Sequence, residues 1–136
     1  MSFKFVGSIL ILFFLIAPVC AQDYSTPRST FEIFKEAAKS NDVQAYIDCT
    51  TRESQEMLSQ RRPNSSQMNN EYRDISDKEY KIEIKGNSAT LFLIPETPCN
   101  PPYFFKKENG QWKIDLIYMS ENIYFDSENN WHWRKQ

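Results

Sequence analysis

Histidine is almost absent from this chain, and its scarcity limits the chemistry open to it. His132 is the only histidine among 136 residues. One imidazole and two cysteines that are expected to pair with each other do not complete a four-ligand zinc site. No serine or cysteine stands beside a recognisable base, as an activated nucleophile requires. The sequence therefore predicts no catalytic residue, no metal site and no cofactor.

An excess of basic charge is also missing. The chain carries 16 lysines and arginines against 18 aspartates and glutamates, a formal net charge of −2. A protein that binds a phosphate backbone needs charge of the opposite sign. Nucleic acid is therefore not expected as a partner.

The N-terminus has the features of a secretory signal. Lys4 precedes a short apolar run at 9–16, which small residues follow. The run is shorter than the roughly 20 residues that a membrane-spanning helix needs. We expect a signal peptide over residues 1–21, cleaved after Ala21, and a secreted or periplasmic product without a membrane span.

Lipidation of Cys20 is the alternative for this N-terminus. The preceding Ala17, Pro18 and Val19 fit the lipoprotein pattern badly, so a lipid anchor is not favoured. Residues 22–136, about 115 in number, suffice for one domain and leave no room for a second core. The signal contains only one of the basic residues, so 15 of them face 18 acidic ones after cleavage, a net charge of −3.

Two cysteines remain in the mature chain, Cys49 and Cys99. An exported protein meets an oxidising compartment, where an even number of cysteines favours a disulfide. Closing a loop of this length stabilises a fold by roughly 4 kcal/mol in the chain-entropy model. A Cys49–Cys99 bridge is therefore expected, although spacing alone does not bring two sulfurs together.

The first half of the mature chain has helical periodicity. After a leader over 22–27, Pro27 suits the first turn of a helix, and Phe31, Phe34 and Ala38 fall on one stripe of it. Two shorter helices are expected next, the last ending before a proline.

The chain then loses its apolar period. Residues 61–70, RRPNSSQMNN, are polar and contain a proline, which predicts a mobile loop. From Glu71 onward the period changes to two, which is typical of strands.

A first hairpin is predicted around the Gly86-Asn87 pair. Its apolar side chains alternate with charged ones and return on the same side after the turn. These apolar residues are Tyr80, Ile82, Ile84, Ala89, Leu91 and Leu93.

A second hairpin is predicted around Asn109-Gly110. A two-residue turn there pairs residues symmetrically about it, with one apolar side. The expected pairs are Lys107 with Trp112, Phe105 with Ile114, and Tyr103 with Leu116. Two hairpins with a shared apolar side form a four-stranded antiparallel meander that the helices cover. The predicted fold class is α+β, with residues 118–136 as a C-terminal strand or tail.

Short helices followed by an antiparallel meander resemble the nuclear-transport-factor-two-like superfamily, whose fold is a cystatin-like α+β cone. The resemblance is strongest to its small exported members of unknown function. The matching features are a helix opened by Pro27, the Asn41-Asp42 break, and Gly110 ahead of Trp112-Lys113-Ile114. The similarity covers roughly residues 25–117. It implies a curved sheet around the helices, with an open end that can hold an apolar ligand.

Such a cavity defines the candidate binding residues. The aromatic and aliphatic side chains of the apolar side are the expected lining: Phe34, Tyr46, Tyr80, Ile82, Phe105, Trp112 and Ile114. Aromatic residues at these spacings are more often simple core. Asp115 is the tempting carboxylate, but strand alternation turns it away from the apolar side and into water.

The outer side of the sheet offers a possible interface. Phe92, Ile94 and Phe104 are expected to be exposed there among charges, as in a homodimer contact. Trp131 and Trp133 are expected to cover the sheet edge or the cone mouth, with stacking on a sugar or at a membrane interface as the alternative.

These patterns favour a secreted, non-enzymatic binding or interaction module. A carrier of a small apolar ligand is the first alternative. An enzyme of the ketosteroid-isomerase-like or dehydratase-like kind is the second.

Overall fold

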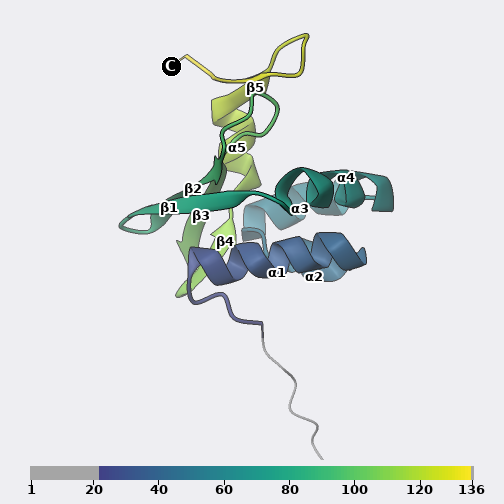
Figure 1. The fold of residues 1–136 in the computed structure, drawn as a ribbon. Helices are drawn as coiled ribbons and strands as arrows, with labels where there is room; N and C mark the ends of the chain where they lie inside the picture. The colour runs from purple at the N-terminus through teal and green to yellow at the C-terminus, as the bar shows by residue number, and fades with distance from the viewer. Residues whose placement is uncertain (1–21, 136) are drawn as a thin grey trace, which may run out of the picture.

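A computed structural model describes residues 22–135, so the expected signal peptide, its cleavage after Ala21 and Cys20 lie outside the described residues. Four helices come first, and four strands, a fifth helix and a short hairpin follow (Figure 1). The helices are α1 (Pro27–Ser40), α2 (Val43–Asp48), α3 (Arg52–Gln60), α4 (Ser65–Ile75) and α5 (Leu116–Asn122). The strands are β1 (Glu79–Lys85), β2 (Ser88–Ile94), β3 (Tyr103–Glu108), β4 (Gln111–Ile114), β5 (Ile123–Phe125) and β6 (Trp131–Trp133). No helix in this part of the chain is both long enough and apolar enough to cross a membrane.

Helix α1 begins and packs as its sequence predicts. Thr26 and Ser29 form a capping box, and Pro27 occupies the first turn, where its missing N–H costs no hydrogen bond. Phe31 and Phe34 are fully buried. Asn41 ends the helix with a left-handed φ of 55°, a conformation that asparagine tolerates.

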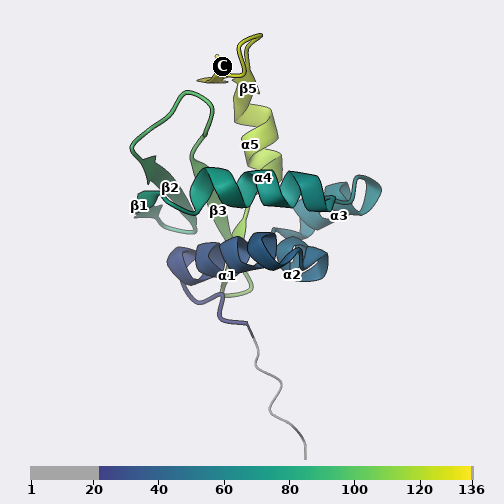
Figure 2. The same ribbon diagram turned by 45° about the vertical axis from the view of Figure 1, so that its right-hand side comes forward.

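The predicted loop over 61–70 is wrong, because helix α4 begins at Ser65. Asn64 and Gln67 form a second capping box, in which each side chain accepts a hydrogen bond from the other's backbone N–H. Met68 and Ile75 are the buried residues of this helix, and the rest of it is mostly polar. The two-residue period therefore starts at β1 and not at Glu71. Helices α1 and α4 lie side by side (Figure 2).

The sheet is an open antiparallel meander in the order β1-β2-β3-β4. Both predicted hairpin turns are confirmed, and in the second hairpin Lys107 lies opposite Trp112 and Phe105 opposite Ile114, as predicted. In the first hairpin Ile82 lies opposite Leu91. Asn109 and Gly110 have φ values of 49° and 76°, as a two-residue type I′ turn requires.

The sheet ends earlier than expected at its last strand. Tyr103 does not pair with Leu116, because Asp115 caps α5 by accepting a hydrogen bond from the Tyr118 N–H at 3.0 Å. Trp112 and Ile114 are buried, as strand alternation predicts, whereas Asp115 lies beyond the end of β4 and is half-buried. The C-terminal strand appears as the separate hairpin β5-β6.

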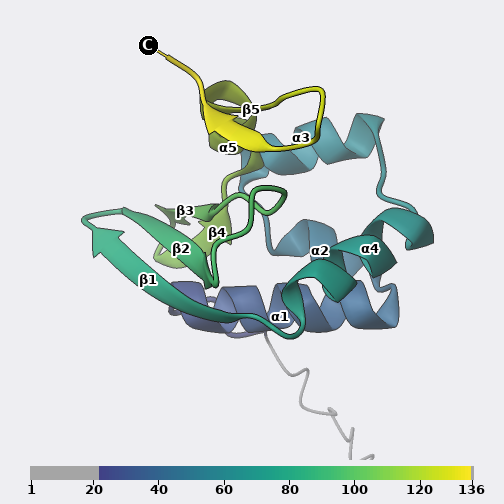
Figure 3. The same cartoon turned by 45° about the horizontal axis from the view of Figure 1, so that its top comes forward.

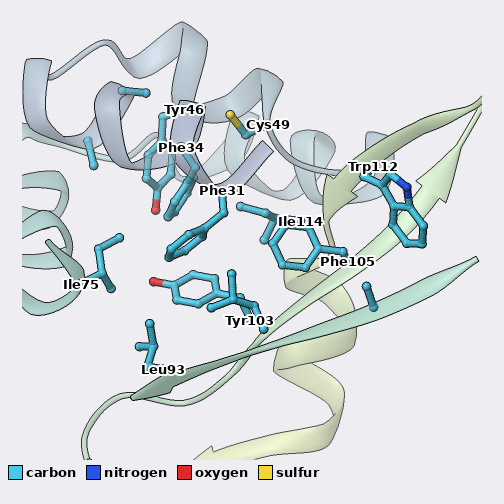
Figure 4. Close-up of a cluster of buried hydrophobic side chains, with 14 of the residues drawn as sticks. Phe31, Phe34, Tyr46, Cys49, Ile75, Leu93, Tyr103, Phe105, Trp112 and Ile114 are labelled. Carbon is cyan, nitrogen blue, oxygen red and sulfur yellow. The ribbon is translucent and has the colours of Figure 1, made fainter. Parts of the chain in front are cut away.

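The hydrophobic core lies between α1, α2 and α4 on one side and the inner face of the sheet on the other. Figure 4 shows side chains from both layers meeting there, with Phe31 and Phe34 close to Tyr103. Their rings stand 5.2 and 5.7 Å from the Tyr103 ring, in tilted and edge contacts.

The outer face of the sheet is partly covered, which corrects one predicted interface residue. Phe104 is only 7% exposed, because Tyr118 of α5 and Trp133 of β6 pack on it with ring separations of 4.9 and 5.6 Å. Ile94 is exposed and Phe92 is half-buried. Trp133 thus covers part of the sheet through its contact with Phe104.

The predicted disulfide is also wrong. Cys49 and Cys99 are both free thiols, the first buried and the second exposed. The Cys49 Sγ donates to the Ala45 carbonyl oxygen at 3.2 Å, within its own helical turn. Cys99 lies in the loop after β2. Counting cysteines could not reveal that one of them belongs to the core.

Candidate functional site: an acidic cleft beside helix α4

A cleft of about 400 Å³ opens between α4, the ends of β2 and β3, the loop at 95–102 and α5. Its volume falls in the range of roughly 300–1,000 Å³ in which small ligands are bound. Its lining comprises Gln67, Asn70, Glu71, Asp74, Ile75, Leu93, Asn100, Pro101, Tyr103, Leu116, Met119 and Phe125.

Glu71 is the central polar group of this cleft. One oxygen of its carboxylate accepts a hydrogen bond from the Tyr103 hydroxyl at 2.7 Å, and the other accepts one from the Tyr46 hydroxyl. Both tyrosines are more than nine-tenths buried. The three side chains form one network that ties α2, α4 and β3 together.

Helical spacing and the packing of the two layers bring Glu71 and the two tyrosines together. Glu71 lies one turn after Gln67 and one turn before Ile75, so all three share the face of α4 that borders the cleft. Tyr46 and Tyr103 project from opposite layers, and Figure 4 shows both hydroxyl oxygens, in red, on the side where Ile75 lies.

Burial sets the protonation of this network. Desolvation of the carboxylate is the largest influence on Glu71 and raises its pKa, and the charge of Asp74 acts in the same direction. The hydrogen bonds from Tyr46 and Tyr103 oppose that rise. Desolvation and the charge of Glu71 raise the pKa values of both tyrosines, which stay protonated donors.

The lining has one sign of charge. It includes the carboxylates Glu71 and Asp74 and three side-chain amides, and no lysine, arginine or histidine. The remaining wall is apolar and is supplied by residues such as Leu93, Met119 and Phe125. The cleft therefore presents hydrogen-bond acceptors and negatively charged groups beside an apolar surface.

None of the seven predicted cavity residues lines this cleft. Phe34, Tyr46, Phe105, Trp112 and Ile114 are buried in the core, and Tyr80 and Ile82 pack against it. These seven side chains pack against one another and the helices, whereas Leu93 and Tyr103 of the same inner side border the cleft. Of the seven, Tyr46 alone contributes to the site, through its hydroxyl on Glu71.

Sequence reasoning missed Glu71 because it placed the residue at the start of the strand-like region and not in a helix. A signal was available: Met68, Tyr72 and Ile75 recur at helical spacing. The capping pair Asn64 and Gln67 marks the helix start. No local pattern could have predicted which tyrosines meet the carboxylate.

Other candidate positions have structural roles. The His132 Nε2 atom lies 2.7 Å from the Asp126 Oδ2 atom within the C-terminal hairpin, and the imidazole stacks on the Tyr124 ring. A hollow of about 390 Å³ on the outer sheet face includes Asp115, whose carboxylate already caps α5. Within residues 22–135, no three histidine, cysteine, aspartate or glutamate side chains gather as a metal site would require.

Comparisons of the chain with protein-family models, with curated proteins and with solved structures give no match. The resemblance to the nuclear-transport-factor-two-like superfamily therefore stays a proposal.

Proposed function

We propose that the protein is an exported, non-enzymatic binding module whose cleft holds a small amphipathic ligand. The ligand places a cationic amine at Glu71 and its apolar body along the wall of Leu93, Met119 and Phe125. The observation that supports this function is a desolvated carboxylate, held by two tyrosine hydroxyls, in an open cleft without a basic residue.

The hydrogen-bond capacity of Glu71 supports an amine. Each carboxylate oxygen has two lone pairs, and Tyr46 and Tyr103 occupy only one on each. The tyrosine hydroxyls already donate to Glu71, so the free capacity at this point is for accepting. An ammonium group supplies donors together with the charge that the desolvated carboxylate lacks.

The apolar wall supports a ligand with a hydrocarbon part. Burial of apolar surface stabilises a complex by about 25 cal/mol per Å². The amide side chains of Gln67, Asn70 and Asn100 border the cleft and can orient a polar substituent. The ligand proposed here is therefore amphipathic, whereas the sequence alone suggested an apolar one.

A matched set of probes tests this function. Hexylamine, hexanol and hexanoic acid share a chain and differ only in the head group. We expect hexylamine alone to raise the melting temperature of the protein beginning at Gln22 in a concentration-dependent way. The Glu71→Gln variant keeps a similar shape, removes the charge and should lose at least about tenfold in affinity, since a charge-assisted bond is replaced by a neutral one.

Two variants serve as controls. Glu56→Gln removes an exposed carboxylate outside the cleft and should leave hexylamine binding unchanged. Met119→Ala removes part of the apolar wall and should weaken hexylamine binding without changing the preference for the amine over hexanol and hexanoic acid. Equal binding of hexylamine and hexanoic acid, or unchanged affinity in Glu71→Gln, would refute the proposed ligand class.

A second candidate function is proton transfer on a bound ligand, which the raised pKa of Glu71 favours. It predicts chemical change of a bound compound, followed by NMR, that stops in Glu71→Gln. The binding-module proposal predicts that bound probes are recovered unchanged.

A further inference from the structure

The outer edge of β1 is the unpaired edge of the meander. The opposite edge, at β4, is occupied: the Ile114 N–H donates to the Cys49 carbonyl and the Trp112 N–H to the Tyr24 carbonyl, both at 2.8 Å. Outside its ladder with β2, no backbone hydrogen bond within residues 22–135 involves β1. Figure 3 shows the β1-β2 hairpin at the margin of the fold, with its turn reaching away from the helices.

The turn fixes which backbone groups of β1 face outward. Gly86 and Asn87 form a two-residue turn closed by Lys85 and Ser88. The residues that close such a turn form a hydrogen-bonded pair, and the pattern alternates along the ladder. Tyr80, Ile82 and Ile84 therefore direct their N–H and C=O groups toward the free edge.

The sequence of β1, Glu79–Lys85, is complementary to itself when it is paired antiparallel about Ile82. Ile82 then lies opposite Ile82 of a second copy, and the backbone N–H and C=O groups that each directs toward the free edge form hydrogen bonds with the other. The flanking pair is Lys81 with Glu83, and the outermost pair is Glu79 with Lys85. Every charged side chain on the outer face of β1 meets the opposite charge, and all seven residues are paired.

The neighbouring registers lack this complementarity. The second copy can shift along β1 only in steps that keep residues with edge-directed backbone groups opposite one another, because only these residues can form the hydrogen bonds between the strands. One step in either direction places Lys81 opposite Lys81, or Glu83 opposite Glu83, and shortens the overlap. Like charges directly opposite one another destabilise a strand pair. The charge pattern and the length of the overlap together therefore favour the register centred on Ile82.

The inner side of β1 has an apolar residue that this pairing would cover. Ile84 is 57% exposed, the most exposed large apolar side chain among residues 22–135. In the register centred on Ile82 it lies opposite Tyr80 of the second copy. An isoleucine beside an aromatic ring is one of the pairs that stabilise neighbouring strands.

We propose that the protein forms a twofold-symmetric homodimer through β1, which joins two four-stranded meanders into one continuous eight-stranded sheet. The surface is isologous, since the same strand serves both copies. It differs from the outer-face interface predicted from the sequence, where Phe104 is covered within its own chain. It is independent of the ligand proposed for the cleft.

Charge reversal tests this interface. Lys81 and Glu83 are exposed at 61% and 56% of their side chains, so their substitution leaves the core intact. By symmetry, Lys81→Glu places two pairs of glutamates opposite each other, and Glu83→Lys places two pairs of lysines. Each variant should weaken dimerisation by about tenfold or more in sedimentation or light-scattering dilution series.

Two combinations restore the attraction. The double variant Lys81→Glu/Glu83→Lys should dimerise like the unmodified chain, and an equimolar mixture of the two single variants should form heterodimers. Lys106→Glu, an exposed reversal on β3, is the matched control and should not change dimerisation. A monomeric unmodified chain throughout the series, or a mixture that stays monomeric, would overturn the proposal.

Discussion

The carboxylate of Glu71 lies where a charge is costly, and its surroundings show how the cost is limited. Desolvation raises its pKa, while hydrogen bonds from Tyr46 and Tyr103 favour the ionised form. All buried side-chain nitrogen and oxygen atoms within residues 22–135 have hydrogen-bond partners. The acceptor capacity that Glu71 retains beside the cleft is therefore the property that makes this residue a candidate for ligand binding.

The raised pKa of Glu71 predicts a pH dependence of stability. Between the ordinary glutamate pKa of about 4.3 and the raised folded value, the folded chain holds a proton that the unfolded chain has lost. The stabilisation from this group is complete below the ordinary value and is lost as pH rises through the folded value. Urea unfolding at several pH values should show this decline in the unmodified chain and not in Glu71→Gln. Glu56→Gln should keep it, and identical slopes in all three chains would contradict the assignment.

Helix α4 is the element on which the cleft depends, because it supplies Glu71 and four other lining residues. Met68 and Ile75 are the buried residues of this helix, so only a narrow apolar stripe packs α4 against the core. The capping box of Asn64 and Gln67 supplies hydrogen bonds that its first turn cannot make internally.

Removal of that cap should destabilise the protein measurably. Asn64→Ala deletes the acceptor of the 2.9 Å bond from the Gln67 N–H and should lower the free energy of unfolding by about 0.5–2 kcal/mol. Asn69→Ala, at an exposed position of the same helix, should change it by less than about 0.5 kcal/mol. Equal effects of the two substitutions in denaturant titrations would show that the cap contributes nothing specific.

At the scale of the whole molecule, the fold separates the two cysteines by environment. Cys49 lies in the core beneath β4, where burial raises the pKa of its thiol to about 12. Cys99 is exposed in the loop after β2. A buried protonated thiol is unreactive, because the thiolate is the nucleophile.

Thiol titration of the chain beginning at Gln22 should therefore proceed in two stages. A chromogenic disulfide reagent at neutral pH should react with one thiol in the native protein and with two after denaturation without reductant. Cys99→Ser should abolish the native reaction and leave the second thiol. A denatured chain with no reactive thiol would instead reveal the disulfide that the cysteine count favours.

The four strands of the meander could be predicted from the sequence, while the β5-β6 hairpin and the candidate site could not. Alternation on both sides of Gly86-Asn87 and Asn109-Gly110 determines register, because a slip of one residue would turn every apolar side chain toward water. Helix α4 was missed because its few apolar residues are spread among polar ones. The contact between Tyr46 and Glu71 spans 25 residues and no local rule specifies it.

By itself, the amino-acid sequence determined the α+β class, the two hairpin registers, the burial of Trp112 and Ile114, and the complementary charges of β1. Each of these follows from spacing within one strand or helix or across one short turn. Only the tertiary structure decided that Glu71 meets two tyrosines, that Cys49 stays a free thiol and that Phe104 is covered. The reason is physical: these contacts depend on how separate layers pack, and packing is set by the shape and volume of the whole core.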